Sequence, residues 1–419
     1  MIVKPFSAYR PPQDVAGDVC GPPYDVLNSA EARVLAEGNP RSILHVNKPE
    51  IDLAEDIDLY SDQVYEMGRS NLHKFISEGW LVKDDSPGFY IYSQQDGDHV
   101  QYGLCALTSV HEYENGKIRI HEHTRAAKQR DRERMVNTQN ANVGPVFLTY
   151  EQNDTIDSIV AQVIKKDPTT QCPGPDNTFH KVWVVSDAEL ITRIVEEFSN
   201  VNAFYIADGH HRAASAFRVG KERYEAAVAA GETVSGDEPF NFFLSVVFPS
   251  TQLKIVDYNR VVKDLNGLNP DEFKEKLSKV FEFTEESNEP IRPSKLHEYS
   301  LLLDNKWYRC VLKDSIVSRL SPDDPVANLD TQILTNEVLS PILNIQDLRT
   351  CNRIDFVGGT RGLEGLEKRC KEDCVAAFAL YPVSIEELMA VADASMLMPP
   401  KSTWFVPKLA SGLVVRMIE

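Results

Sequence analysis

Short apolar stretches alternate with helical stretches along most of the chain, and this alternation limits the possible folds more than any other feature. Residues 182–186 (VWVVS) and 203–207 (AFYIA) resemble strands, and the segment between them repeats apolar residues at helical spacing. Helices that alternate with strands in this way are typical of proteins in which helices cover a sheet. The sequence therefore predicts an α/β (mixed α+β) fold.

Several local patterns predict individual elements. A turn at Asp96-Gly97 between two alternating segments predicts a hairpin, and Ser384 followed three residues later by Glu387 is a capping-box pattern. Thr124 is the expected N-cap of a charged helix. The expected elements are a helix at 58–80, the hairpin at 89–110, the charged helix at 124–136, and a strand pair at 242–250 and 253–262.

Length and composition narrow the class of protein. A chain of 419 residues predicts two or three domains, expected here at 1–95, 96–264 and 265–419. Because 63 acidic residues outnumber 44 Lys and Arg, the net charge is −19, which argues against nucleic acid as a partner. No apolar run is long enough to predict a membrane span, and the N-terminus lacks a secretory pattern. The seven cysteines are odd in number and form no C-x-x-C pair, so we expect a reduced, cytoplasmic protein.

The segment Asp208-Gly209-His210-His211-Arg212 carries the strongest chemical signal. It follows an apolar strand and precedes an alanine-rich helix. A loop of this kind directs backbone N–H groups and the positive end of the helix to one point, where phosphate or carboxylate binds. Arg212 adds a fork suited to phosphate, the histidines can transfer protons, and Asp208 can hold Mg²⁺ or orient a histidine. The simpler interpretation is that these side chains only satisfy carbonyls at the start of a helix.

A second cluster, His121-Glu122-His123-Thr124, allows three interpretations. In a strand, His121 and His123 share a face and, with the other histidines, could assemble a zinc or two-metal site. Alternatively, Glu122 is a general base and the histidines position a phosphate or substrate. The third interpretation is an exposed strand end that leads into a charged helix, whose cations form a solvated face.

The C-terminal loop holds Lys401, Ser402 and Thr403 between prolines, and Lys408 follows the last of these. Lysine beside hydroxyl groups resembles the end of a phosphate-binding P-loop, although the glycines of that motif are missing. We expect Lys401 and Lys408 to face the same cleft as Arg212, where Lys401, Ser402 and Thr403 would bind phosphate and Lys408 would bind substrate; an ordinary turn and strand is the alternative. Asp25 follows Pro22-Pro23-Tyr24, and a turn fixed by the prolines is enough to explain this motif. Asp25 has a functional role only if it faces the same cleft.

Taken together, PPYDV, HEHT, ADGHHR and MPPKSTWFVPKLASGL, in this order, resemble a family described only as a domain of unknown function. Its strand-DGHHR-helix segment is similar to the phosphate-binding box of ParB/sulfiredoxin-fold proteins, which include free L-serine kinases. The resemblance implies a ParB/sulfiredoxin-like nucleotide-binding core with additional N- and C-terminal elements. Asp208, His210, His211 and Arg212 match the nucleotide-phosphate and catalytic motif, and Glu122 and Asp25 are both candidates for the acidic base.

The resemblance implies an enzyme that transfers a phosphoryl group from ATP or ADP, with Mg²⁺, to the hydroxyl of free L-serine. The partners would be nucleotide and a small hydroxylated amino acid, with a homodimer as an open expectation. Two alternatives stay open. One is a metal-dependent hydrolase whose ligands are the clustered histidines. The other is a ParB-like module that binds nucleotide without catalysis.

Overall fold

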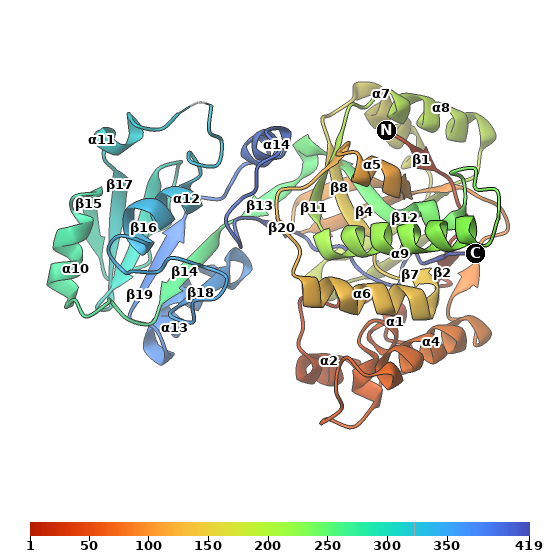
Figure 1. Ribbon diagram of the computed structural model, residues 1–419, viewed down its shortest axis with the longest axis horizontal. Helices are drawn as coiled ribbons and strands as arrows, with labels where there is room; N and C mark the ends of the chain where they lie inside the picture. The colour runs from red at the N-terminus through yellow and green to blue at the C-terminus, as the bar shows by residue number, and fades with distance from the viewer. Residues whose placement is uncertain (322) are drawn as a thin grey trace. The chain divides into compact units, whose positions relative to one another are not determined.

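The computed structural model describes residues 1–321 and 323–419, which form two compact units (Figure 1). Unit 1 contains Met1–Leu253 and Pro407–Glu419, and unit 2 contains Lys254–Val406. These units do not follow the three regions expected from the sequence. The expected boundary at 95/96 falls inside the strand Phe89–Asp96 and divides the hairpin that the sequence itself predicts at 89–110.

Unit 1 is built on a mixed nine-stranded sheet with the order β6-β11-β8-β12-β5-β4-β10-β9, to which β1 adds at β5 (Figure 1). β11 is parallel to β6 and antiparallel to β8. The mixed α+β prediction is therefore confirmed. The strands of this sheet are β1 (Val3–Lys4), β4 (Phe89–Asp96), β5 (His99–Ser109), β6 (Ile118–Arg119), β8 (Val146–Tyr150), β9 (Thr170–Pro173), β10 (Phe179–Val185), β11 (Phe204–Asp208) and β12 (Phe242–Pro249).

Helices and short paired strands surround this sheet. The helices are α1 (Ala16–Val19), α2 (Ser29–Ala36), α3 (Leu44–Asn47), α4 (Asp62–Ser77), α5 (Val110–Glu114), α6 (Ala126–Gln139), α7 (Asp154–Val163), α8 (Ala188–Ser199) and α9 (His210–Ala229). The short pairs are β2 (Tyr9–Arg10) with β3 (Val82–Lys83), and β7 (Ala141–Asn142) with β21 (Arg416–Met417). Short 3₁₀ turns occur at η1 (Pro49–Asp52), η2 (Pro175–Asn177), η3 (Pro239–Asn241) and η4 (Ser250–Gln252).

The core of unit 1 explains why its apolar pattern folds in this way. Ile156 of α7 and Phe198 of α8 are buried in one cluster with Leu148 and Ile206 of the sheet. The carboxylate of Asp187 accepts a hydrogen bond from the N–H of Leu190, which caps the start of α8. The apolar faces of these helices therefore cover one face of the sheet, and the strand that leads to Asp208 is fixed in a packed interior.

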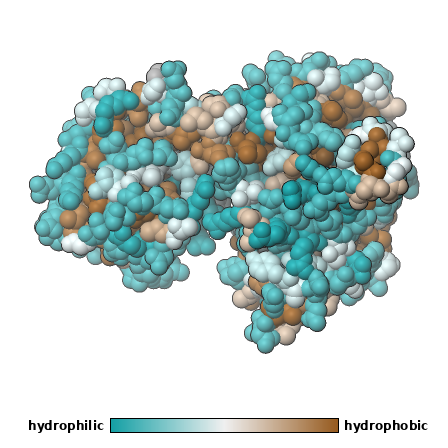
Figure 2. Space-filling model, in the orientation of Figure 1, coloured by the Kyte–Doolittle hydropathy of each residue, from teal (hydrophilic) through white to brown (hydrophobic). Residues whose placement is uncertain are grey.

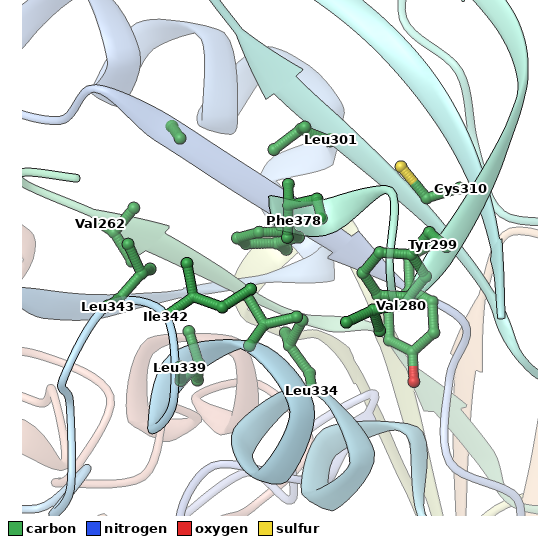
Figure 3. Close-up of a cluster of buried hydrophobic side chains, with 14 of the residues drawn as sticks. Val262, Val280, Tyr299, Leu301, Cys310, Leu334, Leu339, Ile342, Leu343 and Phe378 are labelled. Carbon is green, nitrogen blue, oxygen red and sulfur yellow. The ribbon is translucent and has the colours of Figure 1, made fainter. Parts of the chain in front are cut away.

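Unit 2 has its own sheet and core. Its six strands follow the order β15 (Phe281–Ser287), β17 (Lys306–Leu312), β16 (Glu298–Leu303), β19 (Ala376–Leu380), β14 (Tyr258–Val262) and β18 (Ile354–Gly358). Val262, Leu301 and Phe378 of the sheet pack against Leu334 and Leu339 of the helical segment (Figure 3). The remaining elements are α10 (Pro270–Leu277), α11 (Asp314–Val317), α12 (Asp330–Leu334), the π-helical turn Thr335–Leu339, η6 (Gly359–Arg361), α13 (Gly362–Glu372), α14 (Ile385–Asp393), and β13 (Lys254–Val256) paired with β20 (Trp404–Val406).

Most of the local predictions are confirmed. Helix α4 lies within the expected range 58–80, β4 and β5 form the expected hairpin, and Gly97 in its turn has φ 57°. The capping box of Ser384 with Glu387 is present at α14. Two expectations are wrong. The hydroxyl of Thr124 bonds Gln129 instead of capping α6, and β12 does not pair with β13 or β14, because the boundary between the units separates them.

In the view of Figure 2, hydrophilic residues cover most of the visible face of each unit, and the apolar residues form small separate groups. This distribution is that of ordinary globular surfaces. No helix in the described part of the chain is both long and apolar enough to cross a membrane.

Candidate functional site

The turn from β11 leads directly into the start of helix α9, where Gly209 and His210 are buried. Gly209 has φ 91° and ψ 30°, a left-handed conformation that glycine adopts without strain. Helix α9 then begins at His210, with no side-chain cap and no acidic residue in its first turn. The N–H groups of such a turn and the positive end of the helix dipole attract anions. The local geometry is therefore compatible with the anion-binding site expected from the sequence, and that site stays a prediction.

Asp208, at the end of β11, lies between two cations. Its Oδ2 accepts a hydrogen bond from Nη2 of Arg212 at 3.2 Å, and its Oδ1 lies 3.6 Å from Nζ of Lys408. Burial alone would raise the pKa of Asp208, but the positive charges of Lys408 and Arg212 outweigh it and hold the pKa below its ordinary value. The carboxylate is therefore ionised at neutral pH, and it holds both cations beside the helix start.

The guanidinium of Arg212 is bonded within the protein and is not free for the bidentate phosphate contact that the sequence suggests. Its Nη1 donates to the carbonyl of Pro145, and its Nη2 donates to Asp208. The side chain is only 10% exposed, and its Nε has no hydrogen-bond partner among the described residues. Arg212 therefore contributes a fixed positive charge to the site, and a bidentate contact through both terminal nitrogens would require these bonds to break.

The histidine clusters expected from the sequence meet at this helix start. The rings of His121 and His210 lie 4.5 Å apart, nearly perpendicular, and the N–H of His121 approaches Nε2 of His210 at 3.5 Å. The N–H of Arg125 donates to Nε2 of His211 at 3.0 Å. Burial lowers the pKa of all three histidines, that of His121 to about 4. These histidines are therefore neutral at pH 7, and two of them hold the segment that contains Glu122 against α9.

The expectation that His121 and His123 share the face of a strand is wrong. Residues 121–123 follow β6 outside any strand; His121 is buried, Glu122 is half-buried and His123 is exposed. In the two stretches 1–321 and 323–419, no three His, Cys, Asp or Glu side chains converge so that they could hold a metal ion. The four histidines consequently do not form the metal-ligand set that a hydrolase would need.

The PPYD turn also belongs to this region of unit 1. Burial lowers the pKa of His211, and the negative charge of Asp25 partly opposes this shift. Asp25 therefore lies within electrostatic reach of the loop. The guanidinium of Arg132 lies 4.0 Å above the ring of Tyr24 and pairs with Asp131 at 2.9 Å. For the cations of the charged helix, Lys128, Arg130, Arg132 and Arg134, the sequence favours a solvated face but allows one or two of them to meet an anion. Arg132 is only 12% exposed and is one that does.

The C-terminal loop divides between the units. Lys408 belongs to unit 1, where its carbonyl accepts a hydrogen bond from the side chain of Gln94 and its amine faces Asp208. Lys401 belongs to unit 2; its carbonyl accepts from Arg260, and its amine lies 5.6 Å from the centre of the Tyr258 ring. The hydroxyl of Ser402 donates to the carbonyl of Pro399. It stays a prediction that the site of Arg212 also includes Lys401, Ser402 and Thr403.

Sequence reasoning missed three supporting groups: the carbonyl of Pro145, Gln94 and the stacked Arg132. A glycine and a proline between two apolar strands, at 144–145, mark a sharp loop and could have drawn attention to that segment. Gln94 lies in the middle of a strand, where nothing in the local pattern indicates its contact with Lys408.

The pKa of His121 predicts a pH dependence of stability. Because the buried ring has a pKa of about 4 and an unfolded histidine has about 6.5, the unfolded state binds the proton first as the pH falls. The stability that neutral His121 provides is present above pH 6.5 and is lost toward pH 4. Relative to the variant His121→Gln, the wild type should lose about 2 kcal/mol of unfolding free energy between pH 7 and pH 4.5. Urea unfolding of both proteins at several pH values measures this difference, and parallel pH profiles would contradict it.

No curated protein matches the chain. Among solved structures, a conserved hypothetical protein from Pyrococcus furiosus is 13% identical over 75% of this chain and 95% of its own, with a TM-score of 0.35. A free serine kinase in complex with AMP is 14% identical over 74% and 91%, with a TM-score of 0.34. SbnI from Staphylococcus aureus is 13% identical over 75% and 87%, with a TM-score of 0.37. TM-scores this low carry no argument about the function of this chain.

One family model also matches the chain. It covers residues 3–332, which include the PPYD turn, the 121–125 segment and the loop at 208–212. The chain therefore belongs to the protein family of unknown function DUF1015.

Proposed function

We propose that this protein is a nucleotide-dependent phosphotransferase that acts on the hydroxyl of free L-serine and gives O-phospho-L-serine. The observation that carries the proposal is the uncapped start of α9, beside which Asp208 holds Arg212 and Lys408. Phosphoryl transfer needs fixed positive charge and N–H donors around the phosphates more than it needs covalent chemistry. The phosphoryl donor, ATP or ADP, and the acceptor, L-serine, are inferred from the resemblance of the DGHHR segment to the phosphate-binding box of ParB/sulfiredoxin-like kinases.

In this proposal the described residues have distinct roles. Gly209 gives the loop its left-handed turn, and its N–H bonds the carboxylate of Asp208. The N–H groups at His210 and His211, together with the amine of Lys408, bind the phosphates of ATP or ADP. Arg212 adds its charge. The serine oxygen bonds to the terminal phosphorus, the bond from that phosphorus to the nucleotide breaks, and the hydroxyl proton passes to a carboxylate. Glu122 and Asp25 are the candidates for that base, since both belong to segments next to His211 or His121.

Mg²⁺ belongs to the proposal as a companion of the nucleotide. Magnesium in such sites is bound by one or two carboxylates and by the phosphates themselves, and it neutralises charge on the transferred group. Asp208 would be the single protein ligand of the metal, in exchange for one of its present partners, since Oδ2 faces Arg212 and Oδ1 faces Lys408. The proposal also includes further contacts. Phosphate would be contacted by Lys401, Ser402 and Thr403, and the substrate by His121 and His123.

The amine of Lys408 gives the proposal a specific test. Removing it in Lys408→Ala should weaken ATP or ADP binding about tenfold or more, the effect of losing a hydrogen bond to a charged group. Lys4→Ala is the matched control, because Lys4 also pairs with an aspartate in unit 1, at 2.6 Å from Asp237. Calorimetric titration of nucleotide into the three proteins measures the effect. Equal affinities for wild type and Lys408→Ala would place the phosphates elsewhere.

A screen of nucleotide consumption over hydroxylated amino acids, with the product identified by mass spectrometry, tests the reaction itself. The proposal predicts consumption that depends on L-serine and the appearance of phosphoserine. Nucleotide binding without turnover of any amino acid would favour the ParB-like binding module. A stoichiometric transition metal in untagged protein would favour the hydrolase.

A further inference from the structure

Beside the phosphate loop, unit 1 contains a small cavity of about 50 Å³. Arg132 and Arg212 both line it, and the described residues around it include no aspartate or glutamate. Tyr24, Asn142 and Ser411 contribute further polar groups to the wall. Both arginines are paired with carboxylates outside the lining, Arg132 with Asp131 and Arg212 with Asp208, so what the cavity offers an anionic ligand is hydrogen-bond donors in a wall that contributes no carboxylate of its own.

The two arginines are held in place by the protein. Arg132 lies over the ring of Tyr24 and donates to Asp131 through Nε at 3.1 Å and Nη2 at 2.9 Å. Arg212 is fixed by Pro145 and Asp208, while its buried Nε lacks an acceptor among the described residues. A buried N–H without an acceptor is unfavourable, and a bound oxygen atom would remove that cost.

The size of the cavity restricts what the anion can be. A water molecule needs roughly 10–15 Å³ of such volume, so about 50 Å³ has room for three or four water-sized groups. That is the size of a carboxylate with its adjoining carbon, and it is too small for a whole nucleotide. Carboxylate is one of the planar groups that match the geometry of a guanidinium. Because Arg212 lines this cavity and also bonds Asp208, the cavity lies next to the phosphate loop, within reach of the remaining atoms of a small acid.

We propose that this cavity binds the carboxylate group of the acceptor substrate, and thereby limits the acceptors to small free hydroxy or amino acids. The inference rests on the proposed function, which it makes more specific. An amide or peptide bond in place of the carboxylate would lose the charge that the two arginines attract. Serine within a protein and L-serinamide are thus excluded as acceptors.

Gly144 provides a steric test that removes no polar group. It lines the cavity, and a Cβ at this position would lie 3.3 Å from Oγ of Ser411 and 3.7 Å from Nη1 of Arg212. The variant Gly144→Ala therefore narrows the cavity between these two groups. Gly17→Ala is the matched control, since its Cβ would meet only ordinary contacts, the nearest at 3.7 Å from Cδ of Pro173, and Gly17 does not line the cavity.

Binding is measured by calorimetric titration of L-serine, glycolate and L-serinamide into wild type, Gly144→Ala and Gly17→Ala, each checked for folding by circular dichroism. We expect L-serine or glycolate to bind the wild type and Gly17→Ala equally, to bind Gly144→Ala at least tenfold more weakly, and L-serinamide not to bind. Nucleotide affinity should agree within about twofold among the three proteins.

Failure of this inference can be distinguished from failure of the proposed function. Equal binding of L-serine and L-serinamide, unchanged binding by folded Gly144→Ala, or no binding of either acid overturns the cavity assignment, even if the enzyme phosphorylates serine. Conversely, carboxylate binding that Gly144→Ala weakens, without any phosphorylated product, supports the cavity and contradicts the kinase.

Discussion

Replacement of Asp208 by asparagine is expected to lower kcat by about 100-fold or more while the protein stays folded. The amide keeps the shape of the side chain, but it loses the charge that fixes Arg212 at 3.2 Å and Lys408 at 3.6 Å. The two cations, no longer compensated, should attract phosphates as strongly as before or more strongly. The expected result is therefore a large fall in kcat with a nucleotide Kd that is equal or lower.

The control for this variant is Asp237→Asn. Asp237 also pairs with a lysine, but its side chain is 78% exposed and lies outside the site, so kcat should not change. Steady-state kinetics gives kcat, and nucleotide titration with and without Mg²⁺ gives the Kd, for which the expectation of an equal or lower value applies without Mg²⁺. Wild-type kcat in Asp208→Asn would remove Asp208 from the mechanism. A weaker Kd only when Mg²⁺ is present would show instead that Asp208 acts mainly as a metal ligand.

Replacement of Gly209 by alanine should cost about 1–2 kcal/mol of unfolding free energy from backbone strain alone, because φ is 91°. The new Cβ would also lie 3.0 Å from Nε of Arg212, a side chain that Pro145 and Asp208 hold in place. Arg212 must therefore move, and we expect activity to fall more than tenfold in addition to the loss of stability.

Gly236 is the matched control for Gly209. It has φ 89°, and a Cβ there would meet nothing within 4 Å. Gly236→Ala should therefore show a similar backbone strain with normal activity, so the difference between the two variants isolates the contact with Arg212. Denaturant unfolding and kcat measure the two effects. If both variants lose activity equally, the position of Arg212 does not depend on the absence of a side chain at 209.

The features that the sequence predicts well depend on residues close together in the chain. The capping box of Ser384 and Glu387 joins groups three residues apart, and the turn at Asp96-Gly97 joins two neighbouring strands. Some failures are local, such as the expected Thr124 cap of α6, but most concern distant partners. β12 and β13 follow each other in the chain yet belong to different units, and neither segment carries a pattern that reveals this.

The site shows the same division. A strand, a glycine and a helix with polar residues at the junction could be predicted, because all of them lie in one continuous segment. The meeting of His121 with His210 was only one of several possibilities, since 89 residues separate them. The bond from Arg212 to the carbonyl of Pro145 could not be predicted, because every residue has a carbonyl and the sequence cannot say which one a guanidinium reaches.

Phosphorus NMR of the wild-type protein with L-serine, Mg²⁺ and either ATP or ADP tests the central claim most directly, because it follows the phosphoryl group itself. The account predicts that the terminal phosphate signal of one of these nucleotides declines while a phosphomonoester signal of O-phospho-L-serine grows in equal amount, and that Asp208→Asn suppresses both changes. Release of inorganic phosphate alone, or an unchanged spectrum for both nucleotides, would contradict it.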